Sequence, residues 1–168
     1  MNLVGGQHYP LVRRVMSFGS QFWKRLMRNL HGSYEALKGG LVQDALVDLT
    51  RGAGEEIDMR SVQAHFDLTS GSFWSQLLHF KQKGFLLGAG SPSRYDVHVY
   101  SSGIVQGHVY SLMQGHEVDS HKLVQIRNPW ENEVEWNGPW SNFSPEWTDE
   151  IKHKLKYTPL EKDRILWM

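Results

Sequence analysis

Residues 103–147 read GIVQGHVYSLMQGHEVDSHKLVQIRNPWENEVEWNGPWSNFSPEW, and this stretch predicts two successive β-strands. From His108 onward, β-branched and aromatic residues alternate with smaller ones, and residues 115–120 are typical of a turn. Residues 122–127 alternate again, which puts Asn128 at the end of the return strand. Antiparallel pairing of the two strands can therefore bring Asn128 back beside His108.

A histidine beside an asparagine suits nucleophilic acyl transfer. The imidazole accepts the proton of a nucleophile, and the asparagine oxygen holds the ring in the required tautomer. Such a pair normally serves a cysteine, and this chain contains no cysteine. Because a single histidine in a strand is more often structural than catalytic, the residues by themselves favour a structural role for His108.

Five segments of the chain closely resemble the second half of the calpain protease core. They are GIVQGHVYS at 103–111, KLVQIRNPW at 122–130, EVEWNGPWS at 133–141, LHGSYEALKGG at 30–40 and DLTRGAGE at 48–55. Calpains are calcium-dependent cysteine endopeptidases of papain-like architecture. The resemblance covers residues 21–168, and residues 40–50 are most similar to plant phytocalpains of the defective-kernel type.

The resemblance implies an α+β fold, with a helical N-terminal half packed on an antiparallel β-sheet, like the C-terminal subdomain of the papain-like calpain core. We expect residues 20–168 to form a partial calpain catalytic domain, consisting of linking helices and the second protease subdomain, truncated at its C-terminus. Residues 1–19 fall outside the resemblance and, with Gly5, Gly6 and Pro10, indicate an irregular lead-in.

Apolar spacing and capping residues predict the helices of the chain. They are expected at 20–32, 33–37, 41–49, 73–83 and 144–157, with a buried strand at 85–90. Arg51 stands where calpains usually have glycine, so a positive φ at this position would strain the backbone.

By resemblance, His108 is the general base, Asn128 orients it, and Trp130 shields the pair, although a core aromatic is an equally good interpretation of Trp130. The first subdomain, which in the family carries the cysteine and an oxyanion-stabilising glutamine, is absent from this sequence. We therefore expect the isolated chain to be inert. A non-catalytic homologue that binds proteins through the cleft surface is the competing hypothesis. Ser91 or Ser111 as a replacement nucleophile has no support from spacing.

Calpains bind one calcium ion in this subdomain, and by resemblance Glu135, Asn142 and the carbonyl of Met168 occupy ligand positions. From spacing by itself, Glu133 and Glu135 can be a calcium cage or a solvated strand edge, and spacing favours the edge. Asn142 replaces an aspartate and removes a negative charge, and two further acidic ligands of the family pattern would follow Met168. The sequence therefore predicts an incomplete calcium site with weak or absent binding.

Composition excludes several functions. Eighteen basic residues balance eighteen acidic ones, which argues against nucleic acid and membrane surfaces as partners. No apolar run approaches the ~20 residues of a membrane span, and the first 20 residues contain no secretory signal. We expect a soluble cytoplasmic protein whose partners are protein or peptide substrates or a cysteine-bearing first subdomain. No HExxH motif, paired His/Cys spacing or Gly-x-Ser-x-Gly elbow indicates a zinc or serine enzyme.

Overall fold

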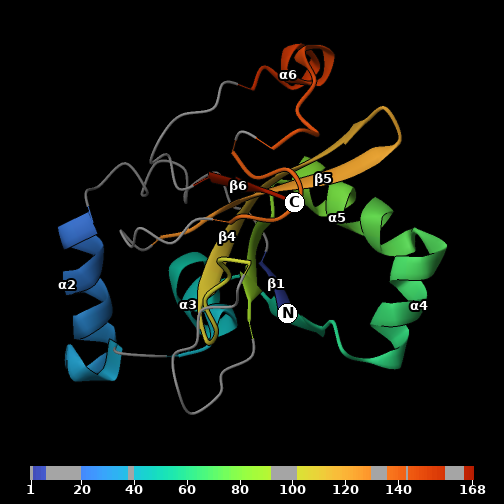
Figure 1. Ribbon diagram of the computed structural model, residues 1–168. Coiled ribbons are helices and arrows are strands. Elements are labelled where there is room, and N and C mark those ends of the chain that lie inside the picture. The colour runs from blue at the N-terminus through green and yellow to red at the C-terminus, as the bar shows by residue number, and fades with distance from the viewer. Residues whose placement is uncertain are drawn as a thin grey trace.

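The computed structural model describes residues 2–6, 20–37, 40–91, 102–129, 136–142, 144–157 and 165–168 (Figure 1). In chain order its elements are β1 (Asn2–Gly6), α2 (Ser20–His31), η1 (Glu35–Leu37), α3 (Val42–Thr50), β2 (Gly54–Asp58), α4 (Val62–Ser70), α5 (Ser72–Gln82), β3 (Leu86–Gly90), β4 (Val109–Val118), β5 (His121–Arg127), α6 (Asp149–Leu155) and β6 (Ile165–Trp167). The predicted α+β class is confirmed.

The strands form one antiparallel sheet in the order β2-β1-β3-β4-β5-β6. The expectation of an irregular lead-in is wrong for Asn2–Gly6, because β1 pairs with both β2 and β3, with Leu3 opposite Ile57 on one side and Ala89 on the other. With two glycines in five residues, β1 lacks the alternation of side chains from which a strand is predicted. The backbone hydrogen bonds to two neighbours stabilise this segment instead, and they depend on residues far along the chain.

The β4–β5 hairpin is present where the sequence predicts one, but its turn is shorter. Only Asp119 and Ser120 form the turn, both with positive φ, of 47° and 68°, as in the two-residue turns that match the twist of a hairpin. Residues 115–118, expected to belong to the turn, continue β4 and pair with residues 121–124. The paired part of the hairpin is therefore longer than its composition indicates.

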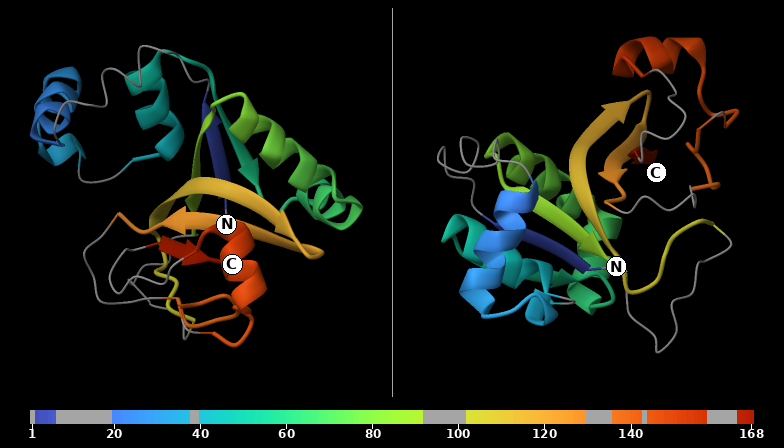
Figure 2. Two further views of the ribbon diagram at one scale, coloured as in Figure 1. Left: turned by 90° about the horizontal axis from the view of Figure 1, so that it is seen from above. Right: turned by 90° about the vertical axis from the view of Figure 1, so that its left-hand side faces the viewer.

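Two clusters of buried side chains lie on opposite faces of the sheet, and Figure 2 shows α5 and α6 on either side of the β4–β5 hairpin. The cluster under α5 contains Leu77, Leu87, Tyr110, Leu112, Ile126 and Leu166. The cluster under α6 contains Val118, Leu123, Trp140, Trp147, Ile151 and Trp167. The hairpin is consequently covered on both faces.

The helix ends differ from the sequence predictions by a few residues, and α4 is a helix that the sequence did not predict. The α5 helix begins at Ser72, one residue before the predicted start at 73, and Gly71, with φ 78°, is its cap. The α6 helix begins at Asp149 rather than at Ser144, because the side chain of Thr148 accepts a hydrogen bond from the N–H of Ile151. In α4 the apolar side chains of Val62 and Phe66 are exposed, so this helix lacks the buried stripe that identifies one in a sequence.

The α2 helix lies at the edge of the molecule beyond α3, packs mainly on η1, and is clear of the sheet in Figure 1 and in the left view of Figure 2. Its apolar side chains at helical spacing, Phe22, Leu26 and Leu30, are 47%, 45% and 61% exposed. Within the described residues no helix has the length and apolar character needed to cross a membrane.

Candidate active site

His108 lies immediately before β4 and is held there through its backbone. The hydroxyl of Ser91, the residue after β3, accepts a hydrogen bond from the N–H of His108 at 3.2 Å, and the N–H of Ser91 donates to the carbonyl of His108 at 3.0 Å. The Ser91 hydroxyl also donates to the carbonyl of Val105 at 2.7 Å. These contacts tie the start of β4 to the end of β3 and fix the position from which the imidazole projects.

The structure brings His108 and Asn128 together. The Nε2 atom of His108 lies 2.8 Å from Oδ1 of Asn128, and each residue is only 4% exposed. An amide oxygen can only accept, so Nε2 is the nitrogen that carries the proton, and in the neutral ring Nδ1 is then the accepting nitrogen. The geometry therefore sets the tautomer in which the imidazole can act as a base at Nδ1.

Tyr110 supports this pair, and sequence reasoning did not single it out. Its ring meets the His108 ring edge-on with centroids 4.8 Å apart, and its hydroxyl accepts a hydrogen bond from the N–H of Val105 at 3.0 Å. Burial raises the pKa of the Tyr110 hydroxyl, while the bond from Val105 opposes that rise. The available signal was spacing, because residues two apart in a strand share a face.

Ser91 and Ser111, the two serines considered as replacement nucleophiles, lie in different surroundings. The Ser91 hydroxyl donates to the Val105 carbonyl and accepts from the His108 backbone. Ser111 is exposed and stands on β4 opposite Arg127, one residue out of phase with Tyr110 and therefore on the other face of the sheet. Neither arrangement supports a serine nucleophile.

Of the residues predicted for calcium, Asn142 and Met168 are described, whereas Glu135 and the proposed shielding residue Trp130 lie outside the described residues. Asn142 Oδ1 accepts a hydrogen bond from the Tyr157 hydroxyl at 2.7 Å. The Met168 carbonyl accepts from the N–H of Val124 at 2.8 Å. Both oxygens are thus already engaged by the protein.

A small cavity beside Asn142 is another place, among the described residues, to consider for a calcium ion. Its volume is about 10 Å³, room for about one water-sized sphere, and it is lined by Trp136, Ser141, Asn142, Ile165, Leu166 and Trp167. Calcium takes about six to eight oxygen ligands in proteins, from carboxylates, carbonyl groups and water. Among the described residues no three His, Cys, Asp or Glu side chains converge to hold a metal ion. Of the three predicted ligands, the described residues thus contain the Asn142 oxygen and the Met168 carbonyl, each already in a hydrogen bond within the protein.

A buried imidazole oriented by an amide oxygen, both carried by adjoining antiparallel strands, is the arrangement of the histidine–asparagine half of a papain-like cysteine protease. A model of the calpain family of cysteine proteases matches residues 9–168. The chain belongs to this family. The match includes part of residues 1–19, which the sequence resemblance had left out.

Individual relatives agree with this assignment. The calpain-type cysteine protease DEK1 of Arabidopsis thaliana is 76% identical over 164 residues, which cover 98% of this chain and 8% of the relative. The calpain-type cysteine protease ADL1 of Oryza sativa subsp. japonica is 75% identical over 139 residues, covering 83% of this chain and 6% of the relative. Calpain clp-1 of Caenorhabditis elegans is 36% identical over 166 residues, covering 89% and 20%. The chain spans less than a tenth of the length of these plant relatives.

Proposed function

We propose that this chain supplies the histidine and asparagine of calpain-type peptide hydrolysis, with His108 as general base and Asn128 as the residue that orients it. The observation that carries the proposal is the buried contact of 2.8 Å between His108 Nε2 and Asn128 Oδ1. Structural histidines also form hydrogen bonds, but this one has the partner, the tautomer and the strand positions of a protease pair.

The chemistry assigned to these residues is one proton transfer and its reversal. Nδ1 of His108 accepts the proton of a nucleophile as that nucleophile attacks a peptide carbonyl, and the resulting imidazolium returns the proton to the leaving amine. Asn128 keeps the ring in the orientation that this exchange needs. The sequence contains no cysteine, so the thiol would come from a cysteine-bearing first subdomain, and the chain by itself should not hydrolyse peptides measurably.

The competing hypothesis, a non-catalytic homologue that binds proteins, predicts a surface without large apolar patches. The row formed by Phe22, Leu26 and Leu30 on α2 is about half exposed, which favours a partial protease whose helix is covered by another part of the enzyme. Binding of a hydrophobic dye that falls when the first subdomain is added would support this view. The substrates of such a protease would be proteins or peptides. A cytoplasmic location of the chain stays a prediction from the sequence.

For calcium, we propose weak or absent binding by this chain. The Asn142 oxygen already accepts a bond from Tyr157, and an amide contributes no negative charge. Calorimetric titration of the wild type should give no saturable signal at micromolar calcium, and Asn142→Asp, which restores a carboxylate, is the comparison. Micromolar affinity of the wild type would contradict the proposal.

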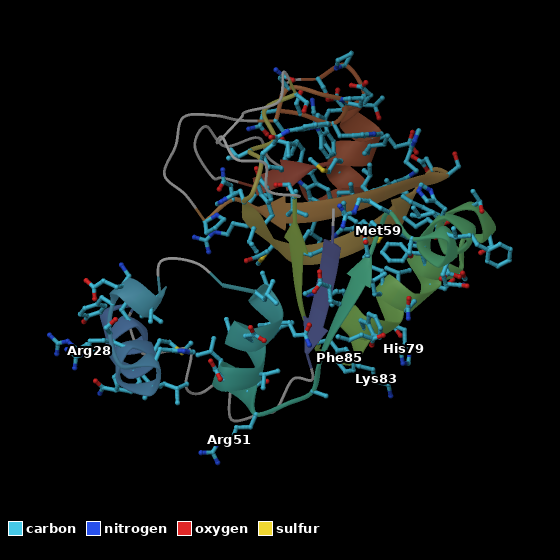
Figure 3. All side chains as sticks on the ribbon, turned by 90° about the horizontal axis from the view of Figure 1, so that it is seen from below. Arg28, Arg51, Met59, His79, Lys83 and Phe85 are labelled. Carbon is cyan, nitrogen blue, oxygen red and sulfur yellow. The ribbon has the colours of Figure 1, made fainter. Side chains whose placement is uncertain are left out.

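The decisive experiment measures hydrolysis of a fluorogenic calpain peptide, with and without calcium, by the chain and by the chain mixed with a cysteine-bearing first subdomain. We expect no turnover by the chain and turnover in the mixture that His108→Ala abolishes. His79→Ala, which changes an exposed histidine of α5 (Figure 3), is the matched control and should keep the activity.

Each other outcome counts against a specific part of the proposal. Turnover by the chain that His108→Ala abolishes would mean that a different residue replaces the cysteine. Turnover in the mixture that survives His108→Ala would remove His108 from the mechanism. A mixture that forms a complex without turnover would favour the protein-binding homologue.

A further inference from the structure

The pairing of β4 with β5 contains one irregularity, and it falls at Met113. On one side of it Leu112 stands opposite Ile126, and on the other side Gln114 stands opposite Gln125. One residue of β4 is thus left over, which makes Met113 a β-bulge. Its side chain is 40% exposed.

The bulge reverses which residues of β4 face α5. Before it, Tyr110 and Leu112 belong to the buried cluster under α5. After it, Gly115 faces α5, since a Cβ built on Gly115 would lie 2.9 Å from the side chain of Leu77. Residues 112 and 115 are an odd number apart, so a regular strand could not point both toward the same helix.

The position of the bulge decides whether His108 and Asn128 meet. With the observed register, Ser111 stands opposite Arg127, which puts Asn128 on the face of Tyr110 and His108. If the pairing of Gln114 with Gln125 simply continued toward the start of β4, Asn128 would stand opposite Ser111. A one-residue slip moves a side chain to the other face, so the His108–Asn128 contact would be lost.

Lys81 of α5 contacts the backbone next to the bulge. Its ammonium group donates to the carbonyl of Leu112, the residue just before the bulge, at 3.4 Å. The side chain is partly buried, no carboxylate pairs with it in the part of the chain that the structure describes, and burial lowers the pKa of its amine. A charged group is costly to bury, so Lys81 gains most where a carbonyl is turned toward it.

We propose that Lys81 is a positioning residue for the His108–Asn128 pair: its contact with the Leu112 carbonyl fixes the bulge at Met113 and thereby places Asn128 on the face of His108. The inference rests on the proposed function for the meaning of that pair. It assigns Lys81 no contact with substrate.

The test uses ¹⁵N NMR of the His108 ring, which distinguishes the two tautomers without any activity measurement. The wild type should show the single tautomer protonated at Nε2, and Asn128→Ala gives the reference signal for a broken pair. Lys81→Met keeps the apolar stem and removes the donor, so the His108 signal should shift toward that reference, whereas Lys81→Arg should restore the wild-type signal. Lys83→Met, which alters an exposed lysine at the end of α5 (Figure 3), should change nothing.

Deletion of Met113 supplies an independent check. Removing the extra residue leaves the pairings on both sides intact, so the His108 signal should stay as in the wild type. Adding Lys81→Met to this deletion should then have no effect on the ring, because no bulge is left to position.

The outcomes separate the two ideas. A wild-type signal in folded Lys81→Met, or a change of the ring signal when Lys81→Met is added to the deletion, would overturn the role of Lys81. If Lys81→Met does not fold, the deletion pair decides alone. A wild type without the Nε2-protonated tautomer would instead contradict the proposed orientation of His108 by Asn128.

Discussion

Asn128 places a polar amide where only 4% of its surface is exposed, and His108 accounts for the position of its Oδ1 atom. We expect Asn128→Ala to lower the free energy of unfolding by about 1–3 kcal/mol, because the buried Nε2–H of His108 loses its acceptor. Urea unfolding measures this change. Asn29→Ala, at an exposed asparagine of α2, should cost less than about 0.5 kcal/mol. Equal costs at the two positions would contradict the importance of the buried contact.

Arg51 is a non-glycine residue in a left-handed backbone conformation, which a Cβ atom makes unfavourable. It caps α3 with φ 55° and ψ 18°, its N–H donates to the carbonyl of Val47, and its side chain is exposed (Figure 3). A non-glycine residue in this region is strained by about 1–2 kcal/mol, and glycine adds about 0.5–1 kcal/mol of chain entropy to the unfolded state. The backbone strain at Arg51 therefore exceeds the entropy that a glycine would add.

Arg51→Gly should consequently raise the free energy of unfolding by about 0.5–1 kcal/mol, as measured by urea unfolding. Arg51→Ala removes the same side chain and keeps the Cβ atom, so it should leave stability within about 0.5 kcal/mol of the wild type. If alanine stabilised the chain as much as glycine, the side chain and not the backbone would be the cause.

At the scale of single residues, the sequence predicted what depends on local period and missed what depends on tertiary contact. The proximity of His108 and Asn128 could be predicted because strand alternation and hairpin pairing place them close together, whereas their catalytic roles came from the resemblance to calpains. Tyr110 was missed as a support, although its spacing to His108 was visible. Lys81 could not be found, because its role depends on a bulge in β4 that no local pattern marks. The roles given to Trp130 and Glu135 stay predictions, since both lie outside the described residues.

At the scale of elements, the packing of α5 on β4 leaves no space above Gly115. A Cβ atom there would lie 2.9 Å from Leu77, 3.2 Å from Leu78 and 3.3 Å from Trp74. Gly115→Ala should lower the free energy of unfolding by about 1–3 kcal/mol, the usual cost of overpacking a core. The same substitution should cost less in a Leu77→Ala background, where the nearest methyl group is gone. An unchanged cost in that background would show that the backbone of Gly115, rather than the helix above it, is the constraint.

The elements that the sequence predicted and those that it missed differ in where their stability arises. The α5 helix has Phe73, Trp74 and Leu77 at helical spacing, and the hairpin alternates, so each carries its own signal. The β1 strand has no such signal because it is stabilised by pairing with β2 and β3. Short strands of this kind have a weak local preference for β structure and are stabilised by pairing with distant strands. This is the general reason that they cannot be predicted from local sequence.

At the scale of the whole molecule, the two faces of the sheet differ in what they carry. The face under α5 carries His108, Tyr110 and Asn128, whereas the face under α6 contains stacked aromatic residues such as Trp147 and Tyr157, whose ring centroids are 4.0 Å apart. The candidate site is therefore held by one core, while the other stiffens the hairpin from behind. Changes on the α6 face should act on stability before they act on the site.

His116 links that second face to pH. It lies on β4 with its ring 5.3 Å from that of Trp167 and its Nε2 2.8 Å from Oε1 of Gln114, and burial lowers its pKa below the ordinary value of 6.5. Because the folded pKa lies below the unfolded one, the unfolded chain takes up a proton first as the pH falls. The contribution of His116 to stability is thus fully present above pH 6.5 and is lost as the pH falls toward the folded pKa.

The chain has nine histidines, and the His116→Gln variant keeps the other eight. The difference in unfolding free energy between wild type and variant therefore isolates the contribution of His116. Urea unfolding at a series of values from about pH 8 down to about pH 5 should show the wild type losing its advantage over the variant through the region where histidine titrates. The glutamine cannot take up a proton, so its own curve should fall less steeply. A difference that stays constant across this range would mean that His116 has the same proton affinity in the folded and unfolded chains, and that its contact with Trp167 does not resist protonation.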